Sequence, residues 1–77
     1  MFEFQLMIGS FQQVQDFVRL AANQPFEIRV GNTWQNINGK DLMGMFSLDY
    51  SRPVTVYAEG ADEYWGSFRQ AAEALCM

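Results

Sequence analysis

Side chains that commonly carry out chemistry are scarce in this chain of 77 residues. It contains no histidine, so it lacks the usual general base, the commonest metal ligand and any site for a phosphohistidine. Its one cysteine, Cys76, has no second cysteine for a disulfide or a zinc site, and we expect an ordinary residue near a helix end. The acidic residues form no pair at a spacing typical of acid–base catalysis. We therefore expect a protein that is not an enzyme and holds no metal or cofactor.

Composition and charge narrow the class of protein further. Hydrophobic residues make up 49% of the chain, which is too rich for a disordered segment, and the length suits one domain over residues 1–77. The net charge is −4, and the five basic residues are spread along the chain, so no nucleic-acid surface is expected. No run approaches the roughly 20 apolar residues of a membrane span, and the start does not resemble a signal peptide. We expect a soluble, cytoplasmic protein without a membrane partner.

Hydrophobic periodicity predicts seven elements that must position any functional side chain. Strands are expected over residues 1–8, 26–30, 33–37 and 54–58, and helices over 10–22, 41–48 and 62–75. The order β-α-β-β-α-β-α favours a two-layer α+β fold, with an antiparallel sheet covered on one face by helices. Trp34 and Trp65 are expected to be core or half-buried residues.

The first helix has clear signals at both ends. Ser10 and Gln13 form a capping-box pattern, in which each side chain bonds the other residue's backbone N–H. Asn23 can take the left-handed conformation that ends a helix, and Pro25 prevents continuation. Between them lies one apolar stripe, made of Phe11, Val14, Phe17, Val18 and Ala21.

The segment NGKDLMGMFSL, residues 38–48, is crowded with apolar side chains. Asp41 is expected at the N-cap of its short helix, and Gly44 limits that helix. Met45 and Leu48 must help to cover the sheet, and on so short a helix the other apolar residues cannot all do the same. These other residues are Leu42, Met43 and Phe46.

The element order, together with NGKDLMGMFSL and VTVYAEGADE (residues 54–63), resembles HPr, the small phosphocarrier of the bacterial sugar phosphotransferase system. Residues 40–48 resemble the regulatory-serine segment of that family, which reads KSIMGVMSL. The resemblance implies an open-faced sandwich of four antiparallel strands in the order 1-4-2-3, covered by three helices. It also implies partners among the enzymes of the phosphotransferase system or proteins of carbon regulation.

Two departures from the family pattern bear on function. The family loop Gly-(Leu or Ile)-His-Ala-Arg-Pro carries the phosphorylated histidine, and the matching residues here begin at Ile8 and end at Gln13. Ser10 occupies the place of the histidine, and Gln12 that of the arginine that grips the phosphate. A serine hydroxyl is a weak nucleophile without an adjacent base, and its phosphate ester is too stable to pass on. We therefore expect no phosphocarrier chemistry.

Asp41 occupies the place of the serine that a regulatory kinase phosphorylates in some members of the family. Two interpretations are open. Aspartate can cap the helix as serine would, since both are favoured N-cap residues. Alternatively, its carboxylate imitates a permanently phosphorylated serine, in the sign of its charge although not in its amount.

The resemblance implies that the apolar segment docks onto proteins. Leu42, Met43 and Phe46, enlarged by Phe11 where the family has alanine, would form an exposed surface for a partner. The alternative is that Leu42 or Phe46 completes a small core. The chain would thus be a non-catalytic adaptor or regulator. Two other hypotheses remain open, namely a phosphotransferase component phosphorylated on Ser10, and an HPr fold reused for unrelated binding.

Overall fold

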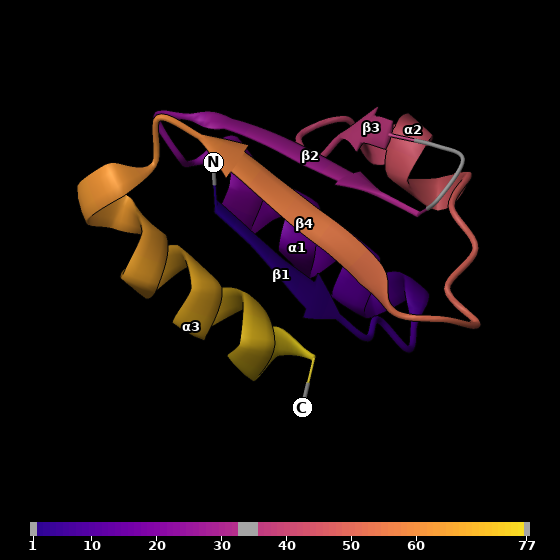
Figure 1. The fold of residues 1–77 in the computed structure, drawn as a ribbon. Coiled ribbons are helices and arrows are strands. Elements are labelled where there is room, and N and C mark those ends of the chain that lie inside the picture. The colour runs from indigo at the N-terminus through magenta and orange to yellow at the C-terminus, as the bar shows by residue number, and fades with distance from the viewer. Residues whose placement is uncertain (1, 33–35, 77) are drawn as a thin grey trace.

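The computed structural model describes residues 2–32 and 36–76. Four strands and three helices follow the predicted order, with a short 3-10 helix before the last one. Their bounds are β1 (Phe2–Leu6), α1 (Phe11–Ala22), β2 (Glu27–Gly31), β3 (Asn36–Asn38), α2 (Leu42–Phe46), β4 (Val54–Glu59), η1 (Asp62–Tyr64) and α3 (Trp65–Leu75). The strands form one antiparallel sheet in the order β1-β4-β2-β3 (Figure 1). The fold class expected from the sequence is confirmed.

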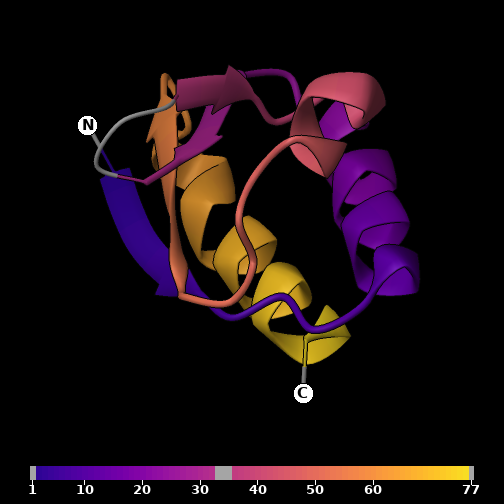
Figure 2. The ribbon, with the colours of Figure 1, turned by 90° about the vertical axis from the view of Figure 1, so that its right-hand side faces the viewer.

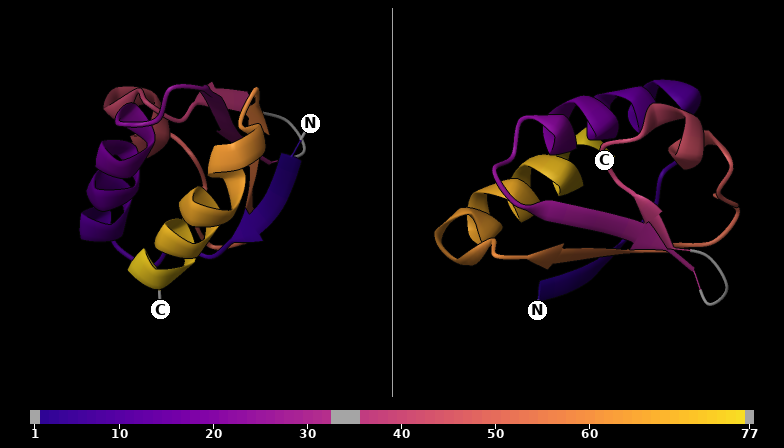
Figure 3. Two further views of the ribbon diagram at one scale, coloured as in Figure 1. Left: turned by 90° about the vertical axis from the view of Figure 1, so that its left-hand side faces the viewer. Right: turned by 90° about the horizontal axis from the view of Figure 1, so that it is seen from above.

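All three helices lie on the same side of the sheet, and the other side is open (Figure 3). Cross-strand register lines up the inward side chains in rows. In one row Phe4 of β1 lies opposite Val56 of β4, which lies opposite Val30 of β2 and then Ile37 of β3. Because side chains alternate along a strand, the residues between these rows point to the open face.

The core between the sheet and the helices is apolar, and none of its described side chains is polar. Phe68 of α3 is its centre, because its ring makes edge contacts with Phe4, Phe17 and Phe26 at centroid distances of 6.3, 6.0 and 5.6 Å. Such aromatic pairs add about 0.5–1.5 kcal/mol each beyond the burial of area. Trp65 is half-buried, as predicted, and stacks on Phe2 at 5.1 Å.

The boundaries of several elements differ from the sequence predictions. Asn23 is right-handed, with φ of −87°, so the left-handed helix end was wrong; its N–H bonds the carbonyls of Ala21 and Leu20 instead. The helix predicted to reach Leu48 ends at Phe46. The acids Asp62 and Glu63 lie in η1, ahead of α3.

The strand predicted over residues 33–37 falls partly outside the described residues. Strand β3 covers Asn36–Asn38 and includes Ile37. Trp34, predicted to be half-buried on this strand, lies outside the described residues.

Two glycines within helices have opposite surroundings. A Cβ added at Gly66 in α3 would meet no atom within 4 Å. A Cβ added at Gly44 in α2 would lie 2.6 Å from Ile37 Cγ2, because α2 crosses closely over β3, and 3.1 Å from an Asp41 carboxylate oxygen. Gly44 is therefore required for the close approach of α2 to the sheet, whereas Gly66 is not.

We expect Gly66→Ala to raise the free energy of unfolding by roughly 0.5–1 kcal/mol, because alanine loses less backbone entropy in a helix. Gly44→Ala should lower it by about 1–3 kcal/mol, because the branched side chain of Ile37 must move aside. Urea unfolding of both variants beside the parent measures the two effects. A change of the same sign in both variants would contradict the packing of α2 on β3.

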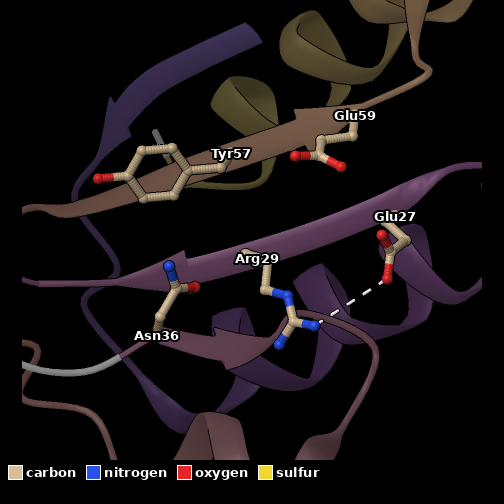
Figure 4. A pocket seen from close by; sticks show the side chains of 5 residues that line it. All are labelled: Glu27, Arg29, Asn36, Tyr57 and Glu59. Carbon is tan, nitrogen blue, oxygen red and sulfur yellow. Dashed lines mark ion pairs between the residues drawn. The ribbon is translucent and has the colours of Figure 1, made fainter. Parts of the chain in front are cut away.

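The open face of the sheet carries one unfavourable charge pair. Glu27 of β2 and Glu59 of β4 lie directly opposite each other, and Figure 4 shows both side chains on this face. Arg29 reduces the repulsion between these two carboxylates only slightly, because its Nη2 is 4.0 Å from Glu27 Oε1 and the side chains of Arg29 and Glu27 are largely exposed. Like charges placed opposite on neighbouring strands destabilise a sheet.

We expect Glu59→Gln to raise the free energy of unfolding by roughly 0.2–1 kcal/mol, since it removes this repulsion. The gain should shrink at high salt, where exposed charges are screened. Glu63→Gln is the matched control, because Glu63 is exposed at the start of a helix and lies opposite no acid. Equal effects of the two changes in thermal unfolding, at low and high salt, would argue against the repulsion.

Candidate functional site

The apolar residues singled out in the sequence come together on two helices. Phe11 lies in the first turn of α1, and Leu42, Met43 and Phe46 lie on α2; these four residues are called the apolar patch. Their exposed fractions are 75% for Phe11, 37% for Leu42, 81% for Met43 and 36% for Phe46. The rings of Phe11 and Phe46 meet edge to face at 5.6 Å. Through this contact the patch joins the start of α1 to α2, two helices that lie on the same side of the sheet (Figure 2).

The short length of α2 explains why these side chains are exposed. The helix has five residues, of which only Met45 is fully buried against the sheet, and Leu48 follows it inward just after the helix. The remaining apolar residues of α2 point away from the core, as the sequence indicated. Leu42 and Phe46 thus contact the core only in part, and neither completes it.

Asp41 stands at the N-cap of α2, as predicted, but its side chain makes no capping hydrogen bond. The backbone of Asp41 forms the hydrogen bonds at this turn. Its N–H donates to Asn38 O at 3.0 Å, and its carbonyl accepts from Met45 N at 2.9 Å. The expectation that the carboxylate caps the helix as serine would is therefore wrong in this structure. The carboxylate of exposed Asp41 lies over the first turn of α2, where its Oδ2 would be 3.1 Å from a Cβ added at Gly44.

Ser10 is the N-cap of α1, and its Oγ accepts a hydrogen bond from Gln13 N–H at 3.2 Å. The return bond of the predicted capping box is displaced by one residue, because Gly9 N–H, and not that of Ser10, donates to Gln13 Oε1 at 2.6 Å. Gln12 points along the helix, where its Nε2 donates to Asp16 Oδ1 at 3.0 Å. The two residues at the places of the family's histidine and arginine are thus engaged in local helix contacts.

Tyr50 belongs to this region, although the sequence patterns did not single it out. Its O–H donates to the carbonyl of Met45, which ties the loop after α2 to the end of that helix. Burial raises the pKa of Tyr50 to about 12. With residues before and within the first turn of α1, Tyr50 lines a hollow of about 440 Å³. A lone aromatic residue in a polar turn was the only sequence signal for it.

Two further hollows lie on the open face of the sheet, on either side of Tyr57. One, of about 480 Å³, is lined by Tyr57 and by Glu27, Arg29, Asn36 and Glu59 (Figure 4). The other, of about 400 Å³, is lined by Tyr57 and by Gln5, Asn32, Asp49, Arg52, Pro53 and Thr55. Hydrogen bonds from the side chain and the backbone of Ser51 lower the pKa of Asp49. These surfaces are polar and exposed, and they hold no buried acid or base.

The described residues contain no other arrangement typical of chemistry. No three histidine, cysteine, aspartate or glutamate side chains in residues 2–32 and 36–76 gather as a metal site would require. Within the same residues, no helix has the length and apolar character to cross a bilayer. Cys76 follows α3 as its C-cap, and burial, with a smaller effect from the charge of Asp16, raises the pKa of its thiol.

Comparisons with protein-family models and with curated protein sequences found no match. A comparison with solved structures found a crystal structure of a phosphocarrier protein HPr from Bacillus anthracis str. Ames. It matches with a TM-score of 0.75 and 18% sequence identity, over 99% of this chain and 96% of that one. The strand order β1-β4-β2-β3 and the three helices on one face agree with that match. The chain therefore has the fold of HPr, an α+β open-faced sandwich.

Proposed function

We propose that this protein is a non-catalytic adaptor that binds a protein partner through the apolar patch and does not carry phosphoryl groups. The observation that supports this most directly is the exposure of Phe11 and Met43 side by side with Leu42 and Phe46, in a chain that contains no histidine. Exposed clusters of methionine and aromatic residues are typical of binding surfaces, because they bury much apolar area and adapt in shape.

The geometry of the patch suits a protein surface better than a small ligand. Phe11 and Met43 project from two different helices, so a partner must cover both to remove them from water. Aromatic side chains that become fully desolvated at the centre of an interface contribute most of its affinity. The edge-to-face pair of Phe11 and Phe46 would form that centre.

The class of partner follows from the HPr fold and the resemblance of residues 40–48 to the family's regulatory segment. We propose a phosphotransferase-system enzyme or a protein of carbon regulation, and hence a role in the cytoplasm. Asp41 would then act as a fixed negative charge at the edge of the contact. Its carboxylate makes no capping bond, which supports a role towards the partner over a role within the helix.

We expect Phe11→Ala and Met43→Ala each to weaken binding of the partner by roughly 2 kcal/mol, or about 30-fold, if they are hot spots. Tyr64→Ala is the control, because Tyr64 is a partly exposed aromatic residue in η1, outside the patch. The measurement is calorimetric titration of each variant and the parent with a partner protein. That partner is purified enzyme I, or a protein first isolated by its binding to the immobilised parent protein. Loss of binding in the Tyr64 variant alone, or in none of the three, would contradict the proposal.

We also expect no phosphoryl transfer. Incubation with phosphoenolpyruvate and enzyme I should leave the intact mass unchanged, because Ser10 has no base bonded to it among the described residues and Gln12 cannot replace arginine's charge. A histidine-containing HPr in the same mixture is the positive control. A gain of one phosphate that disappears in Ser10→Ala would instead support a phosphotransferase component that is modified on Ser10.

A further inference from the structure

The hollow at the start of α1 lies beside the apolar patch and shares Phe11 with it. It has a volume of about 440 Å³ and is lined by Ile8, Gly9, Ser10, Phe11, Val14 and Tyr50; it is called the anchor hollow below. Ile8 and Val14 are fully buried and form its floor, whereas Phe11 is three-quarters exposed and forms a wall. A volume of this order is typical of sites that hold a bulky side chain or a small ligand.

The lining of the anchor hollow determines what chemistry it can accept. No charged side chain lines it. Three of its polar groups bond within the protein: Ser10 Oγ accepts from Gln13 N–H, Gly9 N–H donates to Gln13 Oε1, and Tyr50 O–H donates to Met45 O. A charged or strongly polar group placed here would lose water and gain no partner of opposite charge, which is unfavourable. An uncharged hollow therefore complements an uncharged, apolar group.

The hollows on the open face of the sheet differ in this respect. One is lined by Glu27, Glu59 and Arg29, and the other by Asp49 and Arg52. Charged side chains that remain solvated at those hollows would oppose the entry of an apolar group. Of the three hollows, only the anchor hollow has a lining free of charge.

We propose that the anchor hollow receives one bulky apolar side chain, aromatic or leucine-like, from the protein that covers the apolar patch. This inference rests on the proposed adaptor function and specifies the chemistry of its partner. An inserted side chain would contact Ile8 and Val14 below and Phe11 and Tyr50 at the sides. The apolar patch would surround the entrance and exclude water, which is the arrangement in which a single anchor residue contributes most to affinity.

Amide NMR of the ¹⁵N-labelled protein tests the hollow without the partner. The titrant is N-acetyl-phenylalaninamide, with inorganic phosphate as the charged comparison. We expect saturable shift changes at the amides of Gly9, Ser10 and Tyr50 with the phenylalanine derivative, with a Kd in the millimolar range because only one side chain binds. Phosphate should leave these amides unchanged. The opposite pattern, or shifts centred on Tyr57 of the open face, would overturn the proposal.

Two exposed residues of the apolar patch provide matched variants. Phe11→Ala removes a wall of the hollow and should raise the Kd of the phenylalanine derivative at least about fivefold. Met43→Ala removes an equally exposed side chain that does not line the hollow, and should change Kd by less than about twofold. Equal effects of the two variants on Kd would overturn the proposal. The NMR spectrum of each variant shows directly whether it is folded. If a variant is not folded, the titration of the parent protein alone tests the proposal.

Other occupants of the anchor hollow would give different results. Amide shifts at Gly9 and Tyr50 that depend on protein concentration without any titrant would identify a second copy of this chain. A micromolar Kd for the free derivative would indicate a small molecule. Either result would overturn the proposal that a partner's side chain binds there.

The experiments also separate this proposal from the adaptor function. If N-acetyl-phenylalaninamide does not bind while Met43→Ala still weakens partner binding, the anchor proposal is wrong and the adaptor function stands. If the titration succeeds but neither variant affects partner binding, the adaptor function is wrong, and the partner anchor with it.

Discussion

The exposed surface of this protein depends on how little of α2 the core can accept. The sheet presents a small inner face, and α1 and α3 already cover most of it through Phe17 and Phe68. A helix of five residues laid closely over β3, at a distance that Gly44 permits, can direct only Met45 fully inward. Its other apolar side chains must then meet water or a partner. The exposed apolar patch is thus a consequence of packing geometry as much as of composition.

Several contacts hold this surface in one arrangement. Tyr50 bonds the last turn of α2 through the carbonyl of Met45, and its side chain packs against the core. The ring of Phe46 is thereby presented to Phe11. At the start of α1, Ser10 and Gln13 satisfy backbone donors that a helix end leaves open. The region therefore has the order that a binding surface needs, and its polar groups serve the fold.

The same hydrogen bonds explain why chemistry is not expected at the start of α1. In an HPr-like fold, this place offers a helix N-terminus, where anions are favoured. Here Ser10 serves as a cap, and Gln12 bonds Asp16 further along the helix, where it adds no positive charge. What remains at the surface is a hollow with an uncharged lining.

The element order followed from local patterns, because the alternation of Phe2, Phe4 and Leu6 and the stripe of Val14, Val18 and Ala21 each reflect one buried face. The strand order came only from the resemblance, since periodicity does not determine which strands pair. Local signals placed the end of α1 at the right residue, but they predicted a left-handed Asn23 and a capping side chain at Asp41. At both residues, backbone groups make the hydrogen bonds instead.

By itself, the sequence determined that this chain has no imidazole and that it forms strands and helices in the order β-α-β-β-α-β-α. It also indicated that the short helix at residues 42–46 carries more apolar side chains than it can turn towards the sheet. Only the tertiary structure decided that the rings of Phe11 and Phe46 are in contact, and that Tyr50 lines a hollow with Ile8 and Val14. The physical reason is that hydrophobic periodicity reports only which face of a single helix or strand is buried. The contact of Phe11 with Phe46, and the hollow that Tyr50 shares with Ile8 and Val14, depend instead on how the helices and the loop after α2 lie together over the sheet. The residues that meet there are 35 or more positions apart in the sequence.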